Sequence, residues 1–324
     1  MGWRFFVGGN SRSLKNLLIL SFLALGYQSA SAESLLETFG SGANQFTMEF
    51  VTIGNPGNAA DTTGAPNPAG SVAYTYNLGK YEVSRDMITK ANSEGNLRIS
   101  LGDLTIYGGN GGNKPATAIT WYEAAKFVNW LNTSTGGTAA YKFDGSGTFQ
   151  LWSEWDAGYD ANNLFRNSLA KYWLPSSNEW YKGAYGSPNG TWYDYATGSN
   201  SAPTAVAGGT DPNTAVYGGQ SGPADISNAG GLSAYGTMAQ VGNVTEWNET
   251  AYDGSNNIAG ENRDLRLGRF NSGSNLGASA RSSIAPTDEL AGFIGFRVAS
   301  VPEPSSFSLL AIGLGGLALV RRRK

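Results

Sequence analysis

The side chains that could carry chemistry in this 324-residue chain are limited by two missing residue types. The sequence contains no cysteine and no histidine. This removes thiol nucleophiles, thiolate metal sites, disulfides, the commonest general base and the commonest transition-metal ligand. Carboxylates remain, and a pair of carboxylates can hydrolyse a glycosidic bond. No pair has a spacing that singles it out, so most are expected to be solvated or to cap loop amides. The carboxylates considered are Asp144, Glu154, Asp156, Asp160, Asp194, Asp225, Glu246, Glu249, Asp253 and Asp264.

The overall composition indicates a loop-rich globular domain. The formal net charge is −3, which gives no basic excess of the kind that nucleic-acid binding needs. Glycine occurs 45 times and aromatic residues make up 12% of the chain. Aromatic side chains bury a large area each, while glycine permits tight turns. We therefore expect a compact fold with many loops and no nucleic-acid partner.

Two helices are predicted from their N-terminal capping signals. Thr120 is followed three residues later by Glu123, and Ser176 is followed in the same way by Glu179. In this capping box the hydroxyl and the carboxylate each accept a hydrogen bond from a backbone N–H at the start of the helix. A third helix is expected near residues 84–91.

The other elements are predicted to be short strands joined by polar loops. Strands are expected at residues 46–53 and 72–76, separated by a long loop rich in glycine, proline and asparagine. Residues 33–45 are expected to be a short lead-in. The resulting fold class is α+β, with little regular secondary structure.

The first 32 residues resemble a secretory signal peptide. A basic segment containing Arg4, Arg12 and Lys15 precedes an apolar run at residues 17–25, and residues 30–32 read Ala-Ser-Ala. Small residues at these positions are typical of a cleavage site. We expect this segment to be removed on export; the alternative is that it stays as an N-terminal anchor.

The last 24 residues have three parts in a fixed order. Residues 301–304 read Val-Pro-Glu-Pro, residues 307–320 are apolar, and residues 321–324 are Arg-Arg-Arg-Lys. This order resembles the PEP-CTERM sorting signal of Gram-negative bacteria, in which an exosortase-type enzyme is thought to process the tail. The apolar part is shorter than the ~20 residues of a comfortable membrane-spanning helix. A short transmembrane tail anchor is the alternative, and it would also hold the domain outside the cytoplasm.

Five segments between these ends resemble the formylglycine-generating-enzyme (sulfatase-modifying factor) superfamily. Residues 78–84 (LGKYEVS) are similar to its strand-into-helix opening, and residues 114–125 (KPATAITWYEAA) to its tryptophan-containing helix. Residues 173–180 (WLPSSNEW) match its R-L-P-T-E-A-E-W motif with tryptophan in place of arginine. Residues 235–247 end in its G-N-V-x-E-W core, and residues 295–298 (GFRV) close the domain.

The resemblance implies one domain over about residues 46–300, with the superfamily's loop-rich variant of the C-type-lectin-like fold. Its chemistry does not carry over. The copper-binding cysteine pair follows a segment that here reads RLGRF at residues 266–270, and residues 271–280 contain only Asn, Ser, Gly, Leu and Ala. The three-histidine iron site of ergothioneine-synthase relatives cannot be built either. No catalytic and no cofactor-binding residues are therefore expected.

A structural calcium ion is the one ligand that the resemblance implies. In the family, the G-N-x-x-E loop wraps calcium with backbone carbonyls and the glutamate. By that correspondence Gly242 and Val244 would offer carbonyls and Glu246 a carboxylate, which are ligands that calcium prefers. One family ligand is missing, because its position is Ala239 here. The alternative is that Glu246 only caps loop amides. A second family site falls on residues 213–219, without assignable ligands.

The remaining motif residues are expected to be structural. Trp121, Trp180 and Trp247 occupy apolar positions of capped or tightly turned segments, so we expect them to anchor the core. Arg297 lies between two apolar residues and is expected to meet carboxylates or backbone carbonyls. Neither set is expected to act on a substrate.

These observations predict an exported, surface-associated domain without the family's oxidase chemistry. Its expected place is the outer surface or extracellular matrix of a Gram-negative bacterium, after transient anchoring in the inner membrane. Expected partners are a glycan, a matrix polymer or a surface protein, and residues 186–219 and 251–262 are candidate surfaces. Trp192, Tyr193 and Tyr195 could stack on sugar rings; the alternative for each is burial in the core. A purely structural envelope role and a superfamily enzyme with unassigned metal- or carboxylate-dependent chemistry are the alternatives.

Overall fold

The computed structural model describes residues 34–302, except 274–275 and 290–292. The predicted signal segment at residues 1–32 and the apolar segment at residues 307–320 lie outside the described residues. Among the residues that are described, no helix has the length and apolar character needed to cross a membrane.

The larger sheet has five antiparallel strands in the order β1-β2-β3-β13-β6. These are β1 (Ser34–Phe39), β2 (Phe46–Ile53), β3 (Tyr76–Gly79), β13 (Ala299–Ser300) and β6 (Tyr172–Trp173). The last strand of the chain, β13, therefore lies between β3 and β6, which come from its first and middle parts.

The second sheet has four strands in the order β11-β10-β9-β12. They are β11 (Arg281–Ile284), β10 (Arg263–Arg266), β9 (Thr245–Ala251) and β12 (Ile294–Gly295), and only β12 runs parallel to its neighbour β9. The G-N-V-x-E-W core leads directly into β9.

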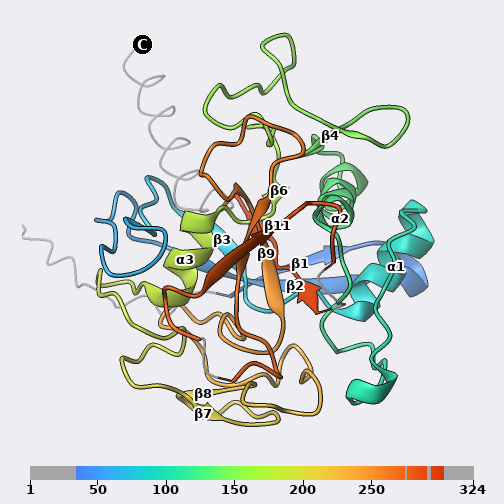
Figure 1. The fold of residues 1–324 in the computed structure, drawn as a ribbon. Coiled ribbons are helices and arrows are strands. Elements are labelled where there is room, and N and C mark those ends of the chain that lie inside the picture. The colour runs from blue at the N-terminus through green and yellow to red at the C-terminus, as the bar shows by residue number, and fades with distance from the viewer. Residues whose placement is uncertain (1–33, 274–275, 290–292, 303–324) are drawn as a thin grey trace, which may run out of the picture. The chain divides into compact units, whose positions relative to one another are not determined.

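Small two-stranded pairs and single turns of 3-10 helix complete the regular structure. The pairs are β4 (Lys142–Phe143) with β5 (Phe149–Gln150), and β7 (Thr204–Ala205) with β8 (Thr214–Ala215). The 3-10 turns are η1 (Gly42–Asn44) and η2 (Thr105–Tyr107). Loops connect all of these and make up much of the domain (Figure 1).

The three predicted helices are confirmed. The Ser84 hydroxyl caps α1 (Arg85–Gly95) by accepting from the Met87 amide. Complete capping boxes begin α2 (Trp121–Ser134), at Thr120, and α3 (Ser177–Tyr185), at Ser176. Local sequence thus determined where these helices start, because a capping box involves only four consecutive residues.

Two sequence expectations about strands need correction. Residues 33–45 are more than a lead-in, since β1 forms there and pairs along its whole length with β2. The strand expected at residues 72–76 forms instead as β3, because β2 pairs with residues 76–79. The backbone of Val72 is engaged in the preceding loop, where its amide donates to Asn58 and its carbonyl accepts from Gly57.

The core is built around the predicted tryptophan anchors. Trp121, Trp180 and Trp247 are all fully buried. The indole of Trp121 donates to the Asn248 carbonyl at 3.0 Å, and that of Trp247 donates to the Ile119 carbonyl at 2.7 Å. These reciprocal bonds join the start of α2 to β9, so the prediction of a structural role is confirmed.

Candidate functional site

A pocket of about 330 Å³ lies where the loop before β6 meets the C-terminal end of the described chain. Its walls include Tyr74 and Thr75 from the loop before β3, Arg166 from the loop between β5 and β6, and Trp173 of β6. Val301 and Pro302, which follow β13, border it as well. We refer to it as the Arg166 pocket.

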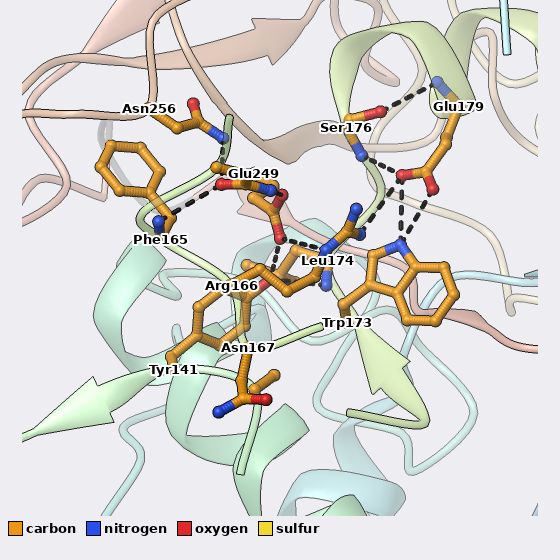
Figure 2. A network of polar contacts seen from close by, with 12 residues as sticks. Tyr141, Phe165, Arg166, Asn167, Trp173, Leu174, Ser176, Glu179, Glu249 and Asn256 are labelled. Atoms are coloured by element: carbon orange, nitrogen blue, oxygen red, sulfur yellow. Dashed lines mark hydrogen bonds and ion pairs between the residues drawn. The ribbon is translucent and has the colours of Figure 1, made fainter. Parts of the chain in front are cut away.

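The floor of the Arg166 pocket is a buried charge network (Figure 2). The guanidinium of Arg166 lies 3.7 Å from a carboxylate oxygen of Glu179 on α3 and 3.7 Å from one of Glu249 on β9. Both carboxylates are 0% exposed, and the Arg166 side chain is 18% exposed. One cation thus sits between two buried anions that come from different elements.

Glu179 is the N3 residue of the α3 capping box and also part of this network. Its carboxylate accepts from the Ser176 amide at 2.6 Å, from the Trp173 indole at 3.1 Å and from the Tyr74 hydroxyl at 2.7 Å. A carboxylate without solvent needs such donors, because burial without hydrogen bonds would be strongly unfavourable. The capping glutamate therefore also holds the pocket wall in place.

Glu249 is held by donors from other parts of the chain. Its carboxylate accepts from the Tyr141 hydroxyl at 2.8 Å and from the Asn163 amide at 2.6 Å. Burial raises the pKa of Glu249, Arg166 opposes this rise, and the charge of Glu179 adds to it. Burial, together with Glu249, also raises the pKa of Tyr141 well above its usual value. Tyr141 therefore keeps its proton and acts as a donor over the physiological range.

The residues of the calcium prediction lie on the turn into β9. Gly242 has a φ of +94°, and a Cβ there would meet the Val216 carbonyl oxygen at 2.5 Å, so only glycine suits this position. Val244 donates its amide to the Glu82 carboxylate at 3.3 Å. The loop is sharply kinked, as the sequence correspondence requires.

The carboxylate of Glu246 is engaged by protein donors. Arg297 donates to both of its oxygens, at 2.7 Å and 2.5 Å, and the Trp180 indole donates at 2.6 Å. The guanidinium also donates to the Gly79 and Met238 carbonyls, both at 2.9 Å, which confirms the structural role predicted for Arg297. In this arrangement the guanidinium of Arg297 neutralises the charge of Glu246. Calcium binding by Gly242, Val244 and Glu246 stays a prediction.

The segment that corresponds to the family's cysteine-bearing stretch contributes apolar side chains to the core. Leu276 and Ala278 are buried and belong to a cluster that also contains Trp180 and Tyr181 of α3. Within residues 34–302, outside the two gaps, no group of three or more Asp, Glu, His or Cys side chains is arranged to hold a metal ion.

The aromatic residues proposed for stacking are only partly exposed. Trp192 and Tyr195 pack against the α3 cluster, and the Trp192 ring centroid lies 5.5 Å from that of Tyr181. Tyr193 is half-buried and donates its amide to the Tyr185 carbonyl at 2.8 Å. Tyr252, in the second candidate surface, is 42% exposed.

Sequence reasoning did not find the Arg166 pocket. Glu179 was identified only as a capping residue, and Glu249 only as one of ten carboxylates without a partner. Arg166 stands in a polar loop with no motif around it. The partners lie 13 and 83 positions further along the chain, so no local pattern could join them.

Comparison with known proteins supports the assignment of the fold. Treponema denticola variable protein 1 is similar at 21% identity over 83% of this chain and 99% of that chain, with a TM-score of 0.55. CarF is similar at 17% identity over 79% and 99%, with a TM-score of 0.58. PvdO from Pseudomonas aeruginosa is similar at 16% identity over 82% and 98%, with a TM-score of 0.52. At these identities the likeness shows the fold alone.

Family models match most of the chain. The description "Sulfatase-modifying factor enzyme 1-like domain" matches residues 44–301, and "PEP-CTERM protein-sorting motif" matches residues 300–324. Among curated proteins, none matches this chain. The predicted fold class is confirmed: an α+β, loop-rich, C-type-lectin-like fold of the formylglycine-generating-enzyme type. The chain belongs to the family of the sulfatase-modifying factor enzyme 1-like domain and carries a PEP-CTERM protein-sorting motif.

Proposed function

We propose that this protein is a non-catalytic surface module that recognises a component of the cell envelope or of the extracellular matrix. The sorting motif at residues 300–324 implies export, processing by an exosortase-type enzyme, and surface or membrane association in a Gram-negative bacterium. We further propose that the processed protein is located on the outer surface or in the extracellular matrix.

The residue types in the segment after β10 support the proposed loss of catalysis. Residues 271–280 offer no soft ligand, and copper needs thiolate or imidazole groups of the kind that this chain lacks altogether. Two of the side chains in this stretch, Leu276 and Ala278, instead complete the apolar cluster around α3. A segment that bears a reactive metal in relatives therefore serves packing in this protein.

The recognition role is supported by the Arg166 pocket. Ligand pockets have volumes of roughly 300–1,000 Å³, aromatic walls and a few placed polar groups. At about 330 Å³, with Trp173 and Tyr74 in its walls and Arg166 at its floor, this pocket meets that description. It is positioned by β6, α3 and β9, so its geometry is set before any ligand arrives.

An oxidase assay tests the catalytic half of the proposal. The purified protein, with and without added copper, is incubated with a cysteine-containing sulfatase-type peptide, and the peptide mass is followed. We expect no aldehyde product above a no-protein control, while a formylglycine-generating enzyme run in parallel converts the peptide. Aldehyde formation by this protein would contradict the proposal.

The recognition half is tested by incubating the exported protein with envelope and matrix material from the cells that produce it. We expect the protein to sediment with that material and to be recovered with it after washing. Failure to bind either fraction would contradict a recognition role.

A further inference from the structure

We infer that the Arg166 pocket binds one residue of an uncharged, polyhydroxylated glycan, with sugar hydroxyls placed between Arg166 and Asp160. This rests on the proposed recognition function and specifies its ligand class.

Arg166 is short of acceptors. A guanidinium carries five N–H donors. Within the described residues, the two ion pairs of Arg166 are both 3.7 Å long, and its buried Nη1 has no hydrogen-bond partner. The guanidinium lies over the Trp173 ring, 4.7 Å from the ring centroid. The exposed part of this guanidinium, 18% of the side chain, can therefore donate to a ligand oxygen.

Asp160 supplies the matching acceptor at the rim. Its Oδ1 accepts from the amide and the side chain of Asn162, whereas its Oδ2 has no hydrogen bond to any described residue. A sugar hydroxyl can donate to a carboxylate and accept from a guanidinium at once, because it carries one O–H and two lone pairs. A hydroxyl group between Asp160 and Arg166 would donate to the carboxylate and accept from the guanidinium.

Tyr74 offers an apolar wall for the C–H face of a sugar ring. Its side chain is 45% exposed, while its hydroxyl is held by Glu179 at 2.7 Å. The ring is thus fixed in orientation yet open to solvent on the pocket side. Burial raises the pKa of Tyr74 well above its usual value of 10, and Glu179 adds to this rise, so the phenol stays protonated.

The charge around the pocket disfavours acidic ligands. Asp160, Glu179 and Glu249 contribute three carboxylates against the single cation of Arg166. Burial raises the pKa of Glu249, yet Asp160 and Glu179 alone still outnumber Arg166. A ligand carboxylate would therefore meet net repulsion in a partly desolvated site. The volume of about 330 Å³ suits one sugar ring, with the rest of the chain outside.

The test uses pairs of sugars that differ only in charge. The exported, processed protein is titrated with glucose against glucuronate and with galactose against galacturonate, and binding is followed by saturation-transfer NMR and by the Arg166 Nε–Hε resonance. We expect at least one neutral sugar to bind and to shift that resonance. Its uronate should bind about tenfold more weakly.

Two variants link this binding to the pocket. Thr75→Trp places a large side chain in the wall and should abolish neutral-sugar binding. The matched control, Ser227→Trp, adds the same side chain to a separate pocket of about 280 Å³ and should leave binding unchanged. Asp160→Asn removes one negative charge and should narrow the difference between neutral sugar and uronate several-fold.

The outcomes separate this inference from the proposed function. The inference is overturned if no neutral sugar shifts the Arg166 resonance, or if a uronate binds more tightly than its neutral sugar. It is also overturned if Thr75→Trp binds the neutral sugar as tightly as the wild type does. If Thr75→Trp still sediments with envelope or matrix material as the wild type does, the recognition role stands and the ligand lies elsewhere. If the wild type does not sediment at all, the recognition role itself fails.

Discussion

Buried arginines hold this domain together at the scale of single residues, each with a different set of partners. Arg297 forms a two-point ion pair with Glu246 and also donates to carbonyls. Arg263 lies over the rings of Trp121 and Phe165, at 4.5 and 3.9 Å from their centroids. Burial lowers the pKa of Arg263 to about 10, which still leaves it charged at neutral pH. Removing a partner from any such group leaves an uncompensated buried charge.

Substitution of Glu246 tests both the ion pair and the calcium prediction. Glu246→Gln leaves the Arg297 guanidinium without its anion and should lower the free energy of unfolding by about 3–5 kcal/mol. Urea unfolding measures this, and Glu154→Gln, at an exposed carboxylate, should change stability by less than about 0.5 kcal/mol.

The melting temperatures of the wild type and of Glu246→Gln are compared with calcium and with a chelator. A calcium ion held by Gly242, Val244 and Glu246 would raise the melting temperature of the wild type only, because a ligand of the native state stabilises it by mass action. Identical melting curves of the wild type in both conditions would remove calcium from the description of this loop.

Glu82 gives a prediction for the pH dependence of stability. Burial raises its pKa well above the usual 4.5, the nearby Glu246 carboxylate adds to this, and Arg297 opposes it. The folded protein therefore holds this proton more tightly than the unfolded chain. The contribution to stability is fully present below about pH 4.5 and is lost as the pH rises through the folded-state pKa. The melting temperature of Glu82→Gln should therefore fall less with rising pH than the melting temperature of the wild type.

Glu49 serves as a control of opposite sign. Although burial opposes it, hydrogen bonds from Lys80 and Ser34 hold the pKa of Glu49 below its usual value. Its contribution to stability is present above the unfolded-state pKa and is lost as the pH falls. Glu49→Gln should therefore change only the acid side of the profile. A Glu82→Gln profile parallel to that of the wild type would contradict the assignment.

The two capping boxes show, at the scale of elements, how one local device serves different purposes. At α2, Glu123 is partly exposed and accepts from the Thr120 and Ser100 amides, both at 3.0 Å. At α3, Glu179 occupies the equivalent position but is fully buried beside Arg166. The first carboxylate begins a helix, and the second also joins α3 to β6 and to the loop that carries Arg166.

This difference predicts unequal costs for the same substitution. Glu123→Gln should lower the free energy of unfolding by less than about 1 kcal/mol, because glutamine also serves in a capping box. Glu179→Gln should cost about 3–5 kcal/mol, since it removes one of two anions around a buried guanidinium. Urea denaturation measures both free energies of unfolding, provided that the m-value of each variant equals that of the wild type. Equal costs would show that Glu179 acts only as a cap.

At the scale of the whole molecule, the described part of the domain includes the first residues of the sorting motif, which matches residues 300–324. Ala299 and Ser300 of β13 pair with both β3 and β6 and are buried. Val301 still donates its amide to the Lys171 carbonyl at 3.0 Å, and its own carbonyl accepts from Asn77 at 3.3 Å. Pro302, the first residue of Pro-Glu-Pro, lies at the rim of the Arg166 pocket. The described contacts of the domain therefore reach the first residue of the Pro-Glu-Pro segment.

Truncation tests this arrangement. A chain that ends at Pro302 should retain cooperative unfolding, because every described contact of β13 is kept. A chain that ends at Val298 should lose it, since β3 and β6 would no longer be joined within the sheet. Circular dichroism during heating distinguishes the two, and cooperative unfolding of the shorter chain would contradict the role given to β13.

Export is tested on the full-length protein in a Gram-negative host that has an exosortase. Mass spectrometry of the exported protein should show loss of residues 1–32 and processing near residues 302–304, because both terminal segments resemble sorting signals. A host without the exosortase should retain the C-terminal segment. Full-length chain recovered from the cytoplasm would contradict this prediction.

Sequence alone determined the features that depend on neighbouring residues or on residue types. Capping boxes at Thr120 and Ser176 span four residues, and β2 follows from its local composition. The proposed loss of the family's metal chemistry rests on residue types alone, because the chain contains no cysteine and no histidine. The motifs also identified the family and the sorting signal, because both are read from short segments in order.

Tertiary structure decided which distant residues meet. The Arg166 network joins side chains from a loop, α3 and β9, while β13 completes a sheet begun more than 200 residues earlier. Such contacts leave no periodicity or spacing in the chain, because they result from the packing of whole elements. The partners of buried charges were decided in the same way. Glu246 pairs with Arg297, and Glu179 pairs with Arg166 in addition to capping a helix, although the sequence around each glutamate does not indicate these partners.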